Sequence, residues 1–220
     1  MSFFDLFAKR QPTLVAQSLD HMDAMLAATE QMVAAAAAHL LEGTAPTKDL
    51  QAADDAVNEL ERQVRRAVLS HLALSGETEV PLSLTLVSVV QDAERIGDLA
   101  KSLAKVADLA DGSLAGPHAD TLRALSADVQ GLFAPVRSAF AESDAAQAEA
   151  AMQTASEIRT RVEAFVADLA QSDGVTVPQA LVLAMSARLH FRIAAHLSAI
   201  ASAVARPFDR LREGPEGDDE

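Results

Sequence analysis

The sequence predicts an all-α protein made of two tandem three-helix bundles, with six long antiparallel helices in total. Half of the 220 residues are hydrophobic but only 4% are aromatic, and much of the hydrophobic fraction is alanine, the strongest helix former. Apolar residues recur every three or four positions through long segments. No segment alternates apolar and polar residues as a half-buried strand does, so no sheet is expected.

Local signals mark the ends of the six helices. The first ends at the segment EGTAPT, and Thr47 or Asp49 begins the second, because such side chains accept hydrogen bonds from the free amides of a first turn. Ser143 or Asp144 begins the fifth helix in the same way, and Pro135 is expected to kink the fourth. The expected helices cover about residues 13–41, 49–74, 80–109, 118–140, 144–169 and 178–205.

An internal repeat divides these helices into two units. The break LALSGETEVPLSL, which begins at Leu72, and the break LAQSDGVTVPQAL, which begins at Leu169, share the pattern L-A-x-S-x-x-x-x-V-P-x-x-L. The same register places Arg95-Ile96 on Arg192-Ile193. We therefore expect one three-helix unit over residues 13–112 and a second, degenerate one over 113–208. An aromatic and basic segment (1–12) precedes them, and an acidic tail (209–220), expected to be disordered, follows.

The charge of the chain restricts its partners. A formal net charge of −14 disfavours nucleic acid, which is bound through Lys and Arg, and broad attachment to anionic lipid. Cysteine is absent, and neither a secretory signal nor an uninterrupted apolar run of about 18 residues is visible, so a cytoplasmic location is expected. The first residues, MSFFDLFAKR, fit either a peripheral membrane contact or a segment folded back over the bundle.

Acidic side chains interrupt the apolar second and third helices. Glu94 and Asp98 are four residues apart and therefore share one helix face, and Asp54 and Asn58 have the same spacing, with Glu61 one turn further on. If the second and third helices pack antiparallel, these oxygen atoms face each other, and carboxylate and carbonyl oxygens suit divalent cations.

The alternative is a solvated helix face in which the acids pair with neighbouring arginines. Arg62, Arg65, Arg66 and Arg95 are placed to do so. Asp92, two residues before Glu94, is a further candidate ligand. Gly97 lies between the acids, and because glycine weakens a helix by roughly 1 kcal/mol, we expect it to admit a close neighbouring helix backbone.

The segments DAERIGDLAKSLA and DDAVNELERQV resemble the PhoU family. The resemblance implies a cytoplasmic, non-catalytic regulator of phosphate uptake, built from two three-helix bundles, that contacts a phosphate transporter or its sensor histidine kinase. Some members bind iron or zinc through acidic pairs, to which Glu94-x-x-x-Asp98 and Asp54-x-x-x-Asn58 correspond here. The resemblance therefore implies a divalent, iron or zinc ion in the first unit, held weakly because Asn58 replaces a charge.

The second unit departs from the family pattern. Phe191 and Ala195 stand where Glu94 and Asp98 stand in the first unit, so at most one acidic site remains. His190 and His196 are six residues apart, too far for one helix face, and are expected to be polar-face or interface residues.

The sequence leaves three interpretations open. They are a PhoU-type regulator, a metal-binding helical protein, and a scaffold that has lost its ancestral role. Flat alanine-rich helix faces indicate self-association, and a homodimer is the expected form.

Overall fold

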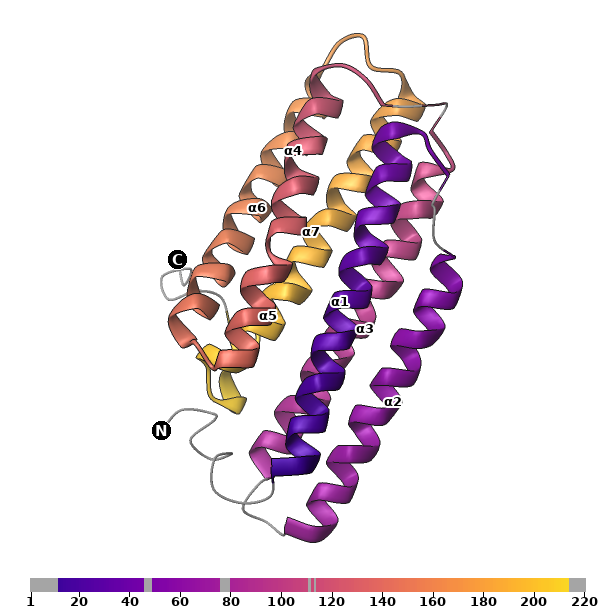
Figure 1. The fold of residues 1–220 in the computed structure, drawn as a ribbon. Helices are drawn as coiled ribbons and strands as arrows, with labels where there is room; N and C mark the ends of the chain where they lie inside the picture. The colour runs from indigo at the N-terminus through magenta and orange to yellow at the C-terminus, as the bar shows by residue number, and fades with distance from the viewer. Residues whose placement is uncertain (1–11, 46–48, 76–79, 111, 113, 214–220) are drawn as a thin grey trace.

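The protein is a bundle of long helices, which confirms the all-α prediction (Figure 1). The computed structural model describes residues 12–45, 49–75, 80–110, 112 and 114–213, and no strand occurs in these ranges. The helices are α1 (Pro12–Glu42), α2 (Leu50–Ser75), α3 (Val80–Ala107), α4 (Pro117–Gly131), α5 (Phe133–Glu142), α6 (Ala145–Gln171), α7 (Val177–Ala205) and the short 3₁₀ helix η2 (Phe208–Arg210).

The contact between α3 and α7 joins the two halves of the chain (Figure 1). Helix α3 packs against α1 and α2, whereas α7 packs against α4, α5 and α6. All six residues from Ala199 to Val204 are buried. Six consecutive residues point in every direction around a helix, so this part of α7 is enclosed on all sides.

The expected helix caps are present. Oδ1 of Asp49 accepts hydrogen bonds from the amides two and three residues later, at 2.9 and 3.1 Å, and Asp144 does the same at the start of α6. Thr176 and Gln179 form a reciprocal capping box at the start of α7. Each cap uses amides that the helix itself leaves without a partner.

The expected fourth helix is divided into α4 and α5, which follow each other along one line (Figure 1). The interruption is at Gly131 and Leu132 rather than at Pro135. The reason is that proline lacks the amide hydrogen that would bond the carbonyl four residues earlier, and its ring collides with that carbonyl, here the one of Gly131.

Part of the expected tail is packed against the bundle. The backbone amide of Arg212 donates to Oγ of Ser202 at 3.0 Å, and its guanidinium group donates to Asp92 on α3. Within the tail predicted from residue 209, Arg212 thus contacts both α7 and α3. The N-terminal segment 1–11 and residues 214–220 lie outside the described residues.

One described helix passes a composition test for a membrane span. The stretch Gln17–Glu42 of α1 is long and apolar enough to cross a bilayer, although the sequence contains no uninterrupted apolar run of that length. Its residues Met25, Met32 and Leu40 are fully or almost fully buried in the bundle. Core helices commonly pass this test, so the result is weak support for a membrane span.

Candidate functional site

An acidic seam, formed by Asp54, Asn58, Glu61, Glu94 and Asp98, lies where α2 meets α3. Nζ of Lys101 is 2.6 Å from Oδ2 of Asp54 and 3.0 Å from Oδ1 of Asp98. Asn58 donates a further hydrogen bond to Asp54 at 3.2 Å, and the Asp54 side chain is only 5% exposed. The facing carboxylates are therefore held together by an ammonium group.

The charges of the acidic seam change the proton affinities of its side chains. Burial and the negative charges of Asp98 and Glu61 raise the pKa of Glu94, although Arg95 opposes them. Burial alone raises the pKa of Asp98, but its hydrogen bond to Lys101 and the charge of that residue outweigh burial and lower it. Burial likewise favours a lower pKa for Lys101, yet the two aspartates raise it. The ammonium is thus stabilised in its charged form.

Local arginine pairs also occur at the acidic seam. Arg95 lies 3.3 Å from Asp98 and 3.7 Å from Glu94, and Arg65 lies 2.7 Å from Glu61. These exposed pairs are those of the solvated-face interpretation, and such pairs contribute little to stability. The seam therefore combines a buried ionic contact with a paired outer rim.

The acidic seam as arranged does not fit a metal ion. Among the described side chains, no group of three or more His, Asp or Glu residues is placed to hold one. The ammonium of Lys101 stands between the carboxylates where a metal cation would be needed. An ion at Asp54 and Asp98 would have to displace Lys101 from both.

The sequence predicted that Gly97 admits a close neighbouring helix backbone, but only side chains of other helices lie near it. A methyl group at this position would meet Oδ1 of Asp54 at 3.6 Å, and side-chain carbons of Met32 and Thr29 at 3.7 Å. These are side-chain atoms at ordinary van der Waals distances. The packing reason that we expected for Gly97 is therefore wrong.

Asp92 does not belong to the acidic seam. Residues two positions apart on a helix point about 200° apart, so Asp92 faces α7 while Glu94 faces α2. Asp92 is 5% exposed, accepts from Nδ1 of His196 at 2.9 Å and from the guanidinium of Arg212 at 3.1 Å. Nothing in the local pattern pointed to these partners, since both are more than 100 positions away along the chain.

The two histidines of α7 lie in different surroundings. His196 is at the interface of α3 and α7, as expected. His190 is fully buried in the bundle and therefore does not lie on a polar face. Its Nδ1 donates to the carbonyl of Ser186 at 2.8 Å, while Nε2 has no hydrogen-bond partner among the residues that the structure describes. Burial lowers the pKa of His190, although the Ser186 carbonyl opposes it.

Comparisons with known proteins agree with this geometry. Residues 22–107, which include α2 and α3, match the family model described as the PhoU domain. The crystal structure of PhoU from Pseudomonas aeruginosa is similar, with a TM-score of 0.80, 23% identity, and coverage of 89% of this chain and 97% of that one.

A second solved structure has the same fold. The phosphate transport system regulatory protein PhoU from Streptococcus pneumoniae matches with a TM-score of 0.70 and 18% identity over 87% of this chain and 91% of that one. No curated protein matches the chain in sequence. Residues 22–107 thus match the PhoU domain in sequence, and the chain has the fold of the two solved PhoU structures, which confirms the resemblance.

Proposed function

We propose that this chain is a PhoU-type regulator of phosphate transport and phosphate-starvation signalling, which acts in the cytoplasm by contact with a phosphate transporter or its sensor kinase. The PhoU domain at residues 22–107 supports this proposal. The similar Streptococcus pneumoniae protein is itself named as a regulator of a phosphate transport system. The proposed role is binding, without a catalytic step.

The observation that carries the proposal is the exposed rim of the acidic seam within the PhoU domain. The Asp98 side chain is 39% exposed and that of Glu94 is 18% exposed, so a partner can reach both. The pKa of Glu94 is raised first by burial and then by the negative charges of Asp98 and Glu61, which repel its carboxylate. A lysine or arginine of a partner would relieve that repulsion, and complementary charge favours both fast association and specificity.

The test measures partner binding and phosphate-dependent repression together. Glu94→Gln and Asp98→Asn, in a host without its own copy, should lose repression of a phosphate-starvation reporter and co-purification of the transporter or kinase. The matched control is Asp120→Asn, because Asp120 lies on α4, is exposed and pairs with Arg123. Seam variants that fold and still repress and co-purify like the unaltered protein would refute this docking site.

Metal binding is a second candidate for a rearranged seam in which Lys101 has moved away, because the charges of Asp98 and Glu61 both act against the carboxylate of Glu94. A cation that displaced Lys101 would relieve this repulsion. Elemental analysis of the purified protein, compared with the double variant Glu94→Ala and Asp98→Ala, tests whether the acidic seam binds a metal ion. Stoichiometric metal that disappears in the double variant supports this role, whereas absence of metal from both contradicts it.

Self-association as a homodimer is also part of the proposal. Two leucines are exposed on neighbouring helices of the first half, namely Leu69 at 67% and Leu84 at 44%. Analytical ultracentrifugation should show a concentration-dependent dimer, which Leu69→Gln weakens if this face is the contact. A monomer at every concentration would exclude it.

A further inference from the structure

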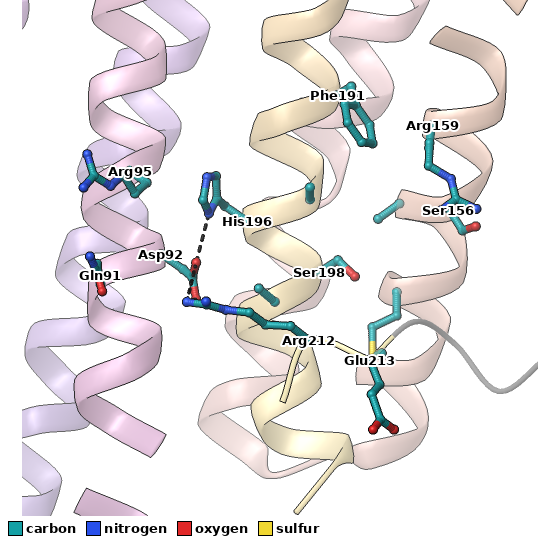
Figure 2. A pocket seen from close by; sticks show the side chains of 14 residues that line it. Gln91, Asp92, Arg95, Ser156, Arg159, Phe191, His196, Ser198, Arg212 and Glu213 are labelled. Atoms are coloured by element: carbon teal, nitrogen blue, oxygen red, sulfur yellow. Dashed lines mark hydrogen bonds and ion pairs between the residues drawn. The ribbon is translucent and has the colours of Figure 1, made fainter. Parts of the chain in front are cut away.

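A cavity of about 550 Å³ lies between α3, α6 and α7 (Figure 2). Each of the three helices contributes to its lining, for example through Asp92, Ser156 and Ser198. The segment that follows α7 contributes as well, through Arg212 and Glu213. One side of the cavity is therefore formed by residues outside the long helices of the bundle.

The beginning of this segment is fixed to the bundle at Arg206. The backbone amide of Arg206 donates to the carbonyl of Ser202 at 2.8 Å. Its guanidinium group donates to Glu149 on α6 through both terminal nitrogens, and the bond from Nη2 measures 3.1 Å. The Arg206 side chain is only 9% exposed. The chain therefore leaves α7 from a firmly held position.

Residues 207–213, which we call the flap, bury little apolar surface. None of them is buried, and only Leu211 is packed partly against the core. Phe208, the one aromatic residue of the flap, is 41% exposed. Segments with few buried apolar contacts open locally at low free energy. Detachment of the flap therefore exposes little of the core to water.

Arg212 attaches the far end of the flap. Its amide donates to Oγ of Ser202 at 3.0 Å, and its guanidinium group donates to Oδ2 of Asp92 at 3.1 Å. Figure 2 shows this side chain reaching Asp92 on α3 from the far end of the flap. The Asp92 side chain is 5% exposed, whereas that of Arg212 is 57% exposed. A hydrogen bond between charged groups is stronger than a neutral one, so this pair is the main polar attachment.

Two features make this attachment reversible. The backbone of Arg212 has a φ of 71°, a left-handed conformation that is unfavourable for a residue with a Cβ atom. Detachment relieves that strain. Asp92 also keeps a partner when Arg212 leaves, because Nδ1 of His196 donates to it at 2.9 Å. Release therefore does not leave a buried carboxylate alone, which would be costly.

We propose that residues 207–213 form a hinged flap that controls access to the cavity, with Arg206 as the hinge and the Arg212–Asp92 pair as the latch. While the latch is closed, Arg212 and Glu213 cover one side of the cavity. Because Asp92 belongs to α3 and the flap follows α7, the closed latch also ties the two halves of the chain together. When the latch opens, solvent and solutes enter from that side.

The rate of thiol modification inside the cavity tests the proposal. The chain has no cysteine, so the variant Ser198→Cys places a single thiol in the lining. Its reaction with the disulfide reagent DTNB is followed by absorbance. Adding Arg212→Gln removes the charge of the latch and should raise the reaction rate at least about threefold, because a partly exposed ion pair makes a modest contribution to closure.

Two controls separate opening of the flap from other effects. Arg210→Gln removes the same charge two residues earlier, where the side chain makes no hydrogen bond or ion pair with a described residue, and should leave the rate unchanged. The variant Ser102→Cys places a thiol at a partly buried position of α3 that does not line the cavity. Its reaction rate should be the same with and without Arg212→Gln.

Hydrogen exchange of the full chain, measured by mass spectrometry, gives a second readout. In Arg212→Gln the amides of residues 207–213 should exchange at least about threefold faster than in the unaltered protein. The amides of α6 should not change, because the hinge contact between Arg206 and Glu149 stays in place.

The proposal fails if Arg212→Gln leaves either the reaction rate of Ser198→Cys or the exchange of residues 207–213 at the value of the Arg210→Gln control. Equal acceleration of Ser102→Cys and Ser198→Cys would also overturn it, since the substitution would then loosen the whole bundle. These results leave the proposed regulation untouched, because the reporter assay of the acidic-seam variants measures it separately.

Discussion

Replacing His190 by leucine should remove a pH-dependent loss of stability. His190 is fully buried on α7, where Nδ1 donates to the Ser186 carbonyl and Nε2 has no partner. Burial lowers the pKa of His190, because a charged imidazole is poorly solvated in the core. The folded protein therefore resists a proton that the unfolded chain accepts.

The direction of the effect follows from this difference in proton binding. The ordinary histidine pKa is 6.5, so the unfolded chain gains a proton as the pH falls below that value while folded His190 stays neutral. The contribution of His190 to the free energy of unfolding is thus complete above pH 6.5 and declines below it. At pH 5.5 the loss reaches about 1.4 kcal/mol when only the unfolded state binds the proton.

Leucine at position 190 cannot take up a proton and leaves no unpaired ring nitrogen. A buried polar atom without a partner costs about 1–3 kcal/mol, so the variant should be at least as stable as the unaltered protein at pH 8. Its advantage should grow by up to about 1.4 kcal/mol between pH 8 and pH 5.5.

Urea unfolding followed by circular dichroism measures this difference, since the chain has neither Trp nor Tyr for fluorescence. Both proteins are compared at pH 8, 6.5 and 5.5, so that the many carboxylates common to both cancel. A stability difference that stays constant across this range would refute the assignment of a depressed pKa to His190.

Three further substitutions can be measured in the same unfolding assay. Gly97→Ala should raise stability by about 1 kcal/mol, because the methyl group fits and alanine favours helix; a loss would mean that the space is too small. Lys101→Met should cost about 3 kcal/mol by leaving the buried Asp54 carboxylate without its cationic partner, and adding Asp54→Asn should recover much of it, whereas additive losses would contradict the pairing. Arg137→Met breaks an α5–α1 contact with Asp23 and should cost up to about 1 kcal/mol in low salt; an equal loss in 1 M salt would exclude an ionic cause.

Features encoded by neighbouring residues were the most predictable from the sequence. The helix boundaries and the caps at Asp49 and Asp144 agree with the structure, because a cap depends on amides only two or three positions away. The sequence predicted that Pro135 disturbs the fourth helix, but it did not predict where the helix is interrupted. Proline disturbs the carbonyl four residues earlier, so the interruption appears at Gly131.

Contacts between distant segments were not predictable in the same way. Asp92 meets His196 and Arg212, which are 104 and 120 positions away, and only the packing of α3 on α7 brings them together. Lys101 could have been found, because it follows Asp98 by three residues and so shares its helix face. The sequence pattern predicted the acidic cluster but not the lysine that lies between its carboxylates.

The two halves of the chain share one arrangement of helices but differ in the side chains between their second and third helices. In the first half, carboxylates and Lys101 fill the seam between the second and third helices and neutralise one another. In the second half, a larger apolar residue, Phe191, stands in place of Glu94 and fills part of the space. Small residues such as Ala155 and Ala195 keep the cavity open beside Arg159. Without the paired carboxylates, the second half cannot hold a cation as the first half holds the ammonium of Lys101.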